Sequence, residues 1–468
     1  MTRSARPGTT VVVLLGLLGG YLAFDAYDVV PGMLTTTAPW PEVAPFPEAP
    51  GAVEPPAPET VYAVPAQSAP VPDAAVMQQQ VDALTGDKRL GSRVSAVVVD
   101  AITGDTLAAA DESELMTPAS AQKILTGVAA LSSPLADRTL ATTVVRDEDT
   151  VTLVGGGDIM LAPGQGDPAA INGRAGMADL ADQVAADLRA AGKKKVRLAV
   201  DDTLFTGPRI APAVSGGNRL YVGAASPIGV NVGLVSNTAY SIGPYVDDAA
   251  RQAGDLLATR LEERGIKVTA LGRGTAPEGA AKIAEVRSAT VAEITEYFLH
   301  SSDNTLTEVV GRLVAIEAGA PGSVDGATQA VVSAVEAQGV DLTGAKLKDC
   351  SGLGDGSRLS ARQLTSIVQL MLDPAHSELR VLAVDMPIGG LNGTLYARFR
   401  DESPARGVVR AKTGSLPRTR ALAGTVMTTD QRQLVFVLLA DAIPPNNAVG
   451  ATWIFDDFVD ELAAYSAG

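Results

Sequence analysis

The sequence predicts an α/β (α+β) fold in which one five-stranded antiparallel sheet, flanked by helices, is assembled from both ends of the folded chain. Near the first end, 93–110 holds two strand patterns separated by a turn, and apolar residues recur at helical spacing from Ser120. Near the other end, three strand patterns precede an amphipathic helical pattern over 451–465. Because strands from both ends are needed to complete the sheet, most of the segment between them is expected to be an insertion.

The strand and helix patterns can be assigned one by one. The first hairpin consists of RVSAVVVDA (93–101) and TLAAA (106–110), with its turn at Thr103-Gly104-Asp105. Pro118 and Ser120 open a helix, SAQKILTGVAAL. The later strands are expected in GVVRAKTG, ALAGTVMTT and QLVFVLLADA, with a turn at Thr429-Asp430-Gln431 between the last two.

The division into domains follows from these patterns. We expect one discontinuous domain made of 76–139 and 290–468, with 140–289 forming one or more inserted domains that have their own strand and helix patterns. The run Gly155-Gly156-Gly157 lacks the Lys-Ser/Thr of a phosphate loop, so a tight turn is expected there. Asp201-Asp202 follows a strand pattern and is expected to form a turn or cap rather than an acid–base pair.

Composition argues against several classes of function. The formal net charge is −16, and nucleic-acid binding needs clustered Lys and Arg to contact phosphates. The single cysteine, Cys350, cannot form an internal disulfide, and with only two histidines it makes a poor set of zinc ligands. The scarcity of histidine also disfavours a Ser-His-Asp triad, so a serine nucleophile here needs a different base. No metal or organic cofactor is implied.

The N-terminal segment predicts export to the cell envelope. Arginines precede an apolar run, Thr9–Phe24, and no further Lys or Arg occurs before Lys88. This asymmetry places the amino terminus in the cytoplasm and the rest of the chain outside it. The run is shorter than the roughly 20 residues of a typical spanning helix, but no clean cleavage site follows it. We therefore expect 1–30 to be a retained anchor in the cytoplasmic membrane rather than a cleaved signal, and the Pro-rich 31–75 to be a disordered, semi-rigid linker.

Ser120 and Lys123 form the first of three short motifs that together indicate catalysis. Residues three apart share one face of a helix, so Lys123 can reach the Ser120 hydroxyl. Ser120 is expected at a helix N-terminus, where unpaired amides and the helix dipole favour developing negative charge. A serine hydroxyl is a weak nucleophile, and a lysine whose pKa is lowered by burial and neighbouring cations can serve as its base.

Ser302 and Asn304 form the second motif, directly after the apolar segment VAEITEYFLH. Residues two apart in a loop can project to the same side. A hydroxyl and an amide placed there can relay a proton and orient a substrate amide.

Lys412-Thr413-Gly414 forms the third motif, inside a strand pattern. Lys412 is expected at an exposed strand position, where its charge lowers the pKa of Lys123 and holds a substrate carboxylate. Gly414 is expected to let an extended substrate approach the backbone. The N–H groups of Ser120 and Ser415 are expected to form an oxyanion hole.

The three motifs are more specific together than apart. Taken singly, a capped helix, an Asx loop and a strand turn would explain them. Each motif occurs once in the sequence, and the three stand in catalytic order in suitable local contexts. Their combination predicts a serine enzyme that transfers acyl groups.

With these motifs, the sequence resembles the DD-carboxypeptidase/endopeptidases of the low-molecular-mass class C penicillin-binding protein family, from about residue 80 to the end. Further strings carry the resemblance: LVGGGDIML (153–161), VDDTLFTGP (200–208), HSSDNTLTE (300–308), DCSGLG (349–354), GGLNGTL (389–395) and KTGSLPRTRALAGTV (412–426). The resemblance implies a penicillin-binding/β-lactamase-like transpeptidase domain with extra domains between the first and second motifs.

The resemblance also implies an activity and the residues that perform it. The expected function is that of a serine-type D-Ala-D-Ala carboxypeptidase acting on peptidoglycan stem peptides, inhibited by β-lactams, with endopeptidase activity on crosslinked peptides as an extension. Ser120 would be acylated and Lys123 would be its base, while Lys412 and Thr413 would bind the terminal carboxylate of the substrate. The alternatives are a wall-binding scaffold without turnover and a serine esterase or D-amino-acid amidase with the same residues.

The sequence departs from related families at several positions. No Asn occurs between Asn304 and Asn392, so the Glu-x-x-x-Asn pattern of class A β-lactamases has no counterpart and a stable penicilloyl adduct is expected. Cys350 stands where the family usually has Gly and is expected to pack in the core. Arg418 and Arg420 replace small neutral residues in an expected loop near the site, where they either alter substrate preference or are simply solvated.

Overall fold

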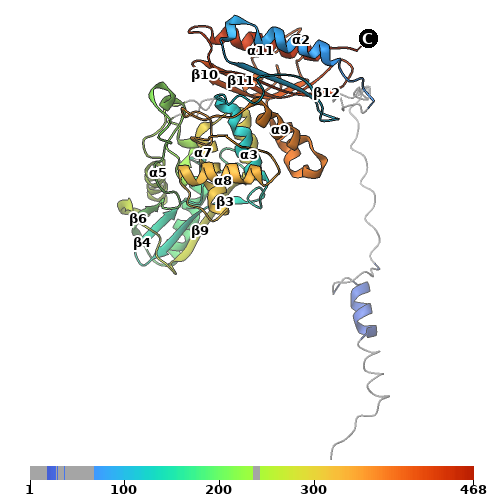
Figure 1. The fold of residues 1–468 in the computed structure, drawn as a ribbon. Coiled ribbons are helices and arrows are strands. Elements are labelled where there is room, and N and C mark those ends of the chain that lie inside the picture. Colours follow the sequence, from blue (N-terminus) through green and yellow to red (C-terminus); the bar gives the residue numbers. More distant parts are fainter. Residues whose placement is uncertain (1–17, 28, 30–35, 37–67, 236–242, 468) are drawn as a thin grey trace, which may run out of the picture. The chain divides into compact units, whose positions relative to one another are not determined.

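The computed structural model describes residues 18–27, 29, 36, 68–235 and 243–467 (Figure 1). The chain divides into two compact units, Met1–Val61 and Tyr62–Gly468. In the first unit, residues 18–26 are helical, and none of the helices in the described ranges is long and apolar enough to cross a membrane. The predicted anchor and linker lie mostly outside the described residues.

A five-stranded antiparallel sheet, here called the central sheet, organises the second unit. Its strand order is β10-β11-β12-β1-β2. The strands are β1 (Val94–Asp100), β2 (Thr106–Ala110), β10 (Val409–Leu416), β11 (Thr419–Met427) and β12 (Gln433–Ala440). Strand β1 pairs with β2 on one side and with β12 on the other. The prediction of one antiparallel sheet built from both ends of the folded chain is therefore confirmed.

Both faces of the central sheet are buried, which explains the nearly continuous apolar runs in its strands. Successive side chains of a strand point to opposite faces. In β12, Leu434, Phe436 and Leu438 join one hydrophobic core, whereas Val435 and Val437 join the other. The first core is covered by α2 (Ala74–Thr85) and α11 (Ala448–Ala464), which lie together over the sheet in Figure 1.

The second core lies under a layer of helices that carries the first two motifs. This layer contains α3 (Lys123–Leu131), α6 (Val291–Ser301), α7 (Asn304–Glu317), α8 (Val324–Glu336), α9 (Ala361–Leu372) and α10 (Arg380–Asp385). Every residue of α3 is buried, because this helix is enclosed by its neighbours. The helix that follows Ser120 is therefore held rigidly from all sides.

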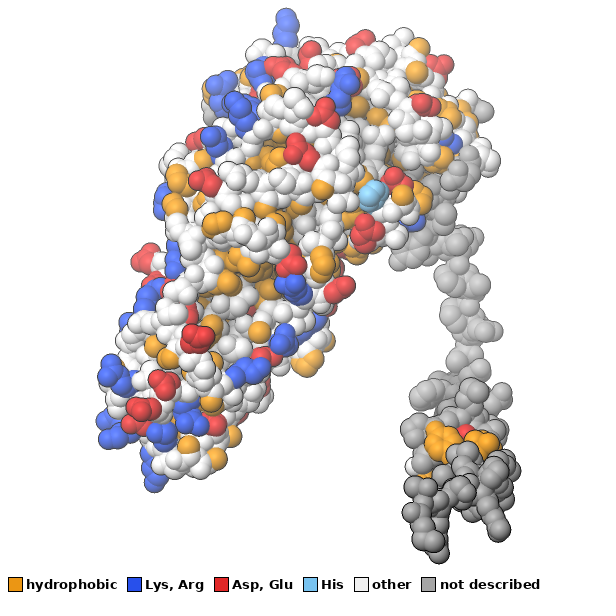
Figure 2. Space-filling view, turned by 60° about the horizontal axis from the view of Figure 1, so that its bottom comes forward, with side chains coloured by type: hydrophobic (Ala, Val, Ile, Leu, Met, Phe, Trp, Pro, Cys, Tyr) orange, Lys and Arg blue, Asp and Glu red, His pale blue; other side chains and the backbone are white. Residues whose placement is uncertain are grey.

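A second five-stranded sheet lies within the expected insertion, in the order β8-β6-β4-β3-β9. Its strands are β3 (Thr139–Asp147), β4 (Thr150–Val154), β6 (Lys195–Asp201), β8 (Lys267–Arg273) and β9 (Ala281–Thr290), and it packs with α4 (Met177–Ala190) and α5 (Ala249–Glu263). A short pair, β5 (Asp158–Leu161) and β7 (Ile228–Val230), lies beside them. Figure 2 shows that positively and negatively charged side chains gather at the end of the second unit that holds β4 and β6 of this second sheet. Whether 140–289 is a separate domain stays a prediction, since Tyr62–Gly468 forms one compact unit.

The second sheet leads the chain into the second motif. Strand β9 ends at Thr290, which also caps α6. The Thr290 side chain accepts from the Glu293 amide, and the Glu293 carboxylate accepts from the Thr290 amide, which is a capping box. Helix α6 then ends at Ser301, immediately before Ser302.

Candidate active site

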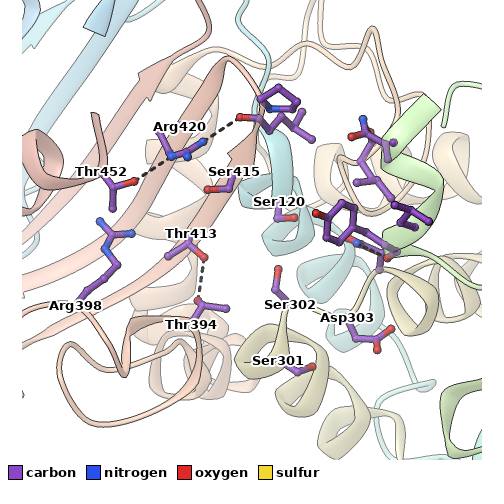
Figure 3. Close-up of a pocket in the computed structure, with 18 residues that line it drawn as sticks. Ser120, Ser301, Ser302, Asp303, Thr394, Arg398, Thr413, Ser415, Arg420 and Thr452 are labelled. Carbon is purple, nitrogen blue, oxygen red and sulfur yellow. Dashed lines mark hydrogen bonds between the residues drawn. The ribbon is translucent and has the colours of Figure 1, made fainter. Parts of the chain in front are cut away.

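Ser120 lies in a 3₁₀ turn, Ala119–Gln122, and the α-helix begins only at Lys123. The expectation that Ser120 lies at a helix N-terminus is confirmed, with a 3₁₀ turn that runs directly into α3 as the first part of that helix. Ala119, directly before Ser120, has φ +47°, a left-handed conformation that is strained for a residue with a Cβ. Ser120 lies in this turn, before α3, and its side chain lines a pocket (Figure 3).

Two glycines lie so close to this strained turn that neither position has room for a side chain. A Cβ on Gly352 would lie 1.9 Å from the Ala119 carbonyl oxygen. A Cβ on Gly414 would lie 2.8 Å from the Pro118 carbonyl oxygen and 3.1 Å from the Ala119 Cβ. Gly414 therefore has a structural role, because any side chain there would push on the segment that carries Ser120. Its expected role in giving a substrate room stays a prediction.

Lys123 connects the first and second motifs. Its Nζ donates to Ser120 Oγ at 2.8 Å, to Asn304 Oδ1 at 2.6 Å and to the Ser351 carbonyl oxygen at 3.0 Å. The side chain is fully buried, and this burial lowers the pKa of Lys123 to about 8, against the opposing effect of three nearby carboxylates. These carboxylates are Asp349, Asp303 and Glu308. Both the charged and the neutral amine are thus accessible near neutral pH, as a general base requires.

Ser302 and Asn304 reach the site because the chain reverses direction between two helices. Ser302 has φ +58° and ψ +31°, which ends α6. Asp303 then caps α7 by accepting from the Leu306 amide at 2.8 Å. Asn304 also donates from Nδ2 to the Tyr221 carbonyl oxygen at 2.8 Å, so its amide orientation is fixed at both ends.

Lys412 is fully buried, and the expectation of an exposed strand position is wrong. Its Nζ donates to Ser302 Oγ at 2.9 Å and to the Thr413 carbonyl oxygen at 3.1 Å. Burial, and then the charge of Lys123, lowers the pKa of Lys412 well below its usual range. The second and third motifs therefore meet at the Ser302–Lys412 pair, in which Ser302 lines the pocket and Lys412 lies beneath its surface.

The backbone of β10 offers hydrogen-bonding groups to the pocket. Strand β10 is an edge strand, and the Ala411 amide and Val409 carbonyl bond outward to Pro387 and Gly389 at 3.0 Å each. Bonding directions alternate along a strand, so the backbone groups of Thr413 and Ser415 face the same open side. Thr413 and Ser415 line the pocket with Ser120, and the role of the Ser120 and Ser415 amides as an oxyanion hole stays a prediction.

The pocket has a volume of about 770 Å³ and gathers most of the predicted residues (Figure 3). Of those, Ser120, Ser302, Asn304, Thr413 and Ser415 line it, while Lys123, Lys412 and Gly414 lie beneath its surface. Sequence reasoning missed several further lining residues: Asn218, Leu220, Tyr221, Ser301, Leu353, Arg398, Leu416 and Thr452. Thr394, whose Oγ1 accepts from Thr413 Oγ1 at 2.9 Å, lies in the GGLNGTL string. No local pattern in the sequence identifies Arg398 or Thr452 as pocket residues, because only the tertiary structure brings them to the pocket.

The comparisons with known proteins identify the family. The chain matches the D-Ala-D-Ala carboxypeptidase 3 (S13) family over residues 77–244 and 233–454. It belongs to this family. Carboxypeptidase DacB of Mycolicibacterium smegmatis is 35% identical over 431 residues, covering 88% of this chain and 89% of that protein. A carboxypeptidase of Mycobacterium tuberculosis is 34% identical over 422 residues, covering 85% of this chain and 87% of that protein.

A solved structure agrees with the fold of this S13 chain. Penicillin binding protein 4 of Haemophilus influenzae superimposes with a TM-score of 0.68 at 18% identity, covering 84% of this chain and 100% of that one. A second crystal structure of that protein, complexed with a novel β-lactam, has a TM-score of 0.62, the same identity and the same coverage. Family membership makes this chain a serine peptidase of the D-Ala-D-Ala carboxypeptidase class, a cell-wall enzyme that acts outside the cytoplasm.

The arginines that depart from the family pattern do not share one environment in this S13 enzyme. The β10–β11 turn is only Pro417-Arg418, because Leu416 already pairs with Thr419. Arg418 is exposed and donates to the Ile443 carbonyl oxygen at 3.0 Å. Arg420 lies in β11, not in a loop as expected, and lines the pocket.

Cys350 and Asp201-Asp202 have the surroundings of structural residues. Cys350 is fully buried beside Gly311, and burial raises the pKa of its thiol well above the usual range. Asp201 accepts from the amides of Thr203 and Ala276, which closes a turn after β6 as expected. Asp202 is paired with Arg209 and Arg273.

Proposed function

We propose that this S13 enzyme releases the terminal D-alanine of peptidoglycan stem peptides through an acyl-enzyme on Ser120. The observation that carries the proposal is the Lys123 Nζ, 2.8 Å from Ser120 Oγ and with its pKa lowered to about 8. The neutral amine takes the hydroxyl proton while Ser120 Oγ attacks the carbonyl of the penultimate D-alanine. The amides of Ser120 and Ser415 stabilise the oxyanion that forms.

The leaving D-alanine needs a proton on its nitrogen. Ser302 Oγ accepts from Lys412 Nζ and lines the pocket, so it is placed to pass a proton outward while Lys412 resupplies it. Asn304, held between Lys123 and Tyr221, orients the amide of the substrate. Water then attacks the ester and gives one proton back through Ser302 to Lys412. As the bond between the acyl group and Ser120 Oγ breaks, Lys123 returns its proton to that oxygen, which regenerates the enzyme. On a crosslinked peptide the same steps constitute endopeptidase activity.

β-Lactams are expected to acylate Ser120, and the resulting acyl-enzyme is expected to be hydrolysed slowly. A structural relative, penicillin binding protein 4, has been solved with a β-lactam. The absence of any Asn between Asn304 and Asn392 removes the counterpart of the deacylating pattern of class A β-lactamases. Attachment to the cytoplasmic membrane is also part of the proposal. The apolar run Thr9–Phe24, which arginines precede, anchors the enzyme there.

Labelling with a fluorescent penicillin tests the proposal. The full chain is compared with Ser120→Ala and with Ser301→Ala, a matched control whose hydroxyl also lies at the pocket but donates to the Tyr297 carbonyl oxygen at 2.7 Å within α6. A stable adduct on the wild type and on Ser301→Ala, with none on Ser120→Ala, supports the mechanism. A folded wild-type protein that remains unlabelled would instead support a wall-binding scaffold without turnover.

A further inference from the structure

Arg420 is the charged group of the pocket whose charge has no opposite partner. The pocket lining contains Asp303, Arg398 and Arg420 as its charged residues. Asp303 is 2% exposed and caps α7. Arg398 is paired with Asp456 of α11, so its charge is matched. No carboxylate of the described residues lies within ion-pair distance of Arg420.

The hydrogen bonds of Arg420 orient it without neutralising it. Its Nε donates to Thr452 Oγ1 at 3.0 Å, and one Nη donates to the carbonyl oxygens of Leu416 and Thr419 at 2.9 and 2.7 Å. All three acceptors are neutral. A guanidinium has five N–H donors in a fixed fork, so the other Nη remains to bind an anion. Burial, followed by the charge of Arg398, lowers the pKa of Arg420. The charged guanidinium is thus destabilised in the pocket, and a bound anion would offset this destabilisation.

The register of the hairpin places Arg420 beside the third motif. Arg420 pairs with Ser415 across the β10–β11 ladder, and paired residues have their side chains on the same face, about 5 Å apart. Thr413 lies two residues from Ser415 and therefore on that face as well. Figure 3 shows Arg420, Ser415 and Thr413 together on one wall of the pocket.

Lys412 lies on the other face of β10, where it is buried and donates to Ser302. A carboxylate that enters the pocket beside Ser120 thus meets the Arg420 guanidinium and the two hydroxyls before any lysine.

We propose that Arg420 is the specificity-determining residue that binds the C-terminal carboxylate of the substrate, together with the hydroxyls of Thr413 and Ser415. This inference rests on the proposed function and assigns the principal cation of its carboxylate subsite. Lys412 then acts through Ser302 on proton transfer rather than as the main carboxylate ligand.

The test compares two peptides that differ only at the end: one ending in D-Ala-D-Ala with a free carboxylate, the other with a C-terminal carboxamide. The ratio of their kcat/KM values measures carboxylate recognition and does not depend on how much of a preparation is folded. Arg420→Gln, which retains donors for Thr452 and Leu416, is expected to lower this ratio about 10- to 100-fold. Arg420→Lys should retain part of it, because the charge remains but the planar fork is lost.

Arg418→Gln is the matched control, because Arg418 is the exposed arginine of the same hairpin and does not line the pocket. It should keep the wild-type ratio. A ratio in Arg420→Gln equal to that of the wild type would overturn the inference while leaving the proposed function intact. A wild-type enzyme that hydrolyses neither peptide would overturn the proposed function itself.

Discussion

The central sheet and the second sheet each have five strands, yet they differ in what they bury. The central sheet is covered on both faces, and the helical layer beneath it encloses charged groups such as Lys123, Lys412 and Arg312, each at most 1% exposed. In the second sheet, the edge strand β8 is mostly exposed. Lys195, at the start of β6, is exposed as well. Burial shifts pKa values and fixes positions, whereas exposed charges are screened. The catalytic residues therefore lie at the β10 edge of the central sheet, where the surrounding charged groups are buried.

The largest expected contrast is between two lysines that each begin an element, Lys123 in α3 and Lys195 in β6. Lys123→Met removes the base and should lower the rate of acylation by penicillin about 10³-fold. Lys195→Met changes a solvated side chain and should leave the rate as it is. Single-turnover labelling kinetics measure both. Equal rates for the two variants would mean that another group activates Ser120.

A smaller contrast comes from one glycine in each sheet. In Gly414→Ala the new Cβ meets the Pro118 carbonyl oxygen and Ala421, so the turn of Ser120 must shift. We expect a loss of about 1–3 kcal/mol in the free energy of unfolding and acylation slowed roughly 10- to 100-fold.

Gly272→Ala in β8 is the control, because nothing lies within 4 Å of its Cβ. Denaturant unfolding and labelling kinetics should show changes within about 0.5 kcal/mol. A tolerated Gly414→Ala would show that the nucleophile turn is not held against β10.

The smallest expected effect is a shift along the pH axis. The base form of Lys123 is the neutral amine, so acylation should rise with pH and level off above its pKa of about 8. Glu308 is one of the carboxylates that raise the pKa of Lys123. Glu308→Gln, which keeps an oxygen for the amides of Cys350 and Ser351, removes that negative charge and should move the rising limb to lower pH.

The direction of this shift is the decisive outcome, and pH–rate profiles of acylation measure it. A limb that moves to higher pH, or stays in place, would mean that the buried carboxylates do not act on Lys123. Lys195→Met, in the second sheet, should have the wild-type profile.

Local patterns predicted much of the fold and the reactive residues, because strands, helices and motif spacing are local properties. The hairpin around Gly104, the helix over 451–465 and the serine–lysine spacing are of this kind. The exposure of Lys412 was predicted wrongly, since a strand pattern does not say which face the helical layer covers. Arg420 was expected in a loop, because the sequence does not show that Pro417-Arg418 alone makes the turn. Arg398 and Thr452 join the pocket only through tertiary structure.

The release of D-alanine from an acylated peptide ending in D-Ala-D-Ala tests the central claim most directly. The full-length wild type and Ser120→Ala are incubated with the peptide, and D-alanine is quantified against time. The account predicts steady release by the wild type and a covalent acyl adduct that mass spectrometry finds on the peptide containing Ser120, with neither in the variant. Release of D-alanine by folded Ser120→Ala at the wild-type rate would contradict it.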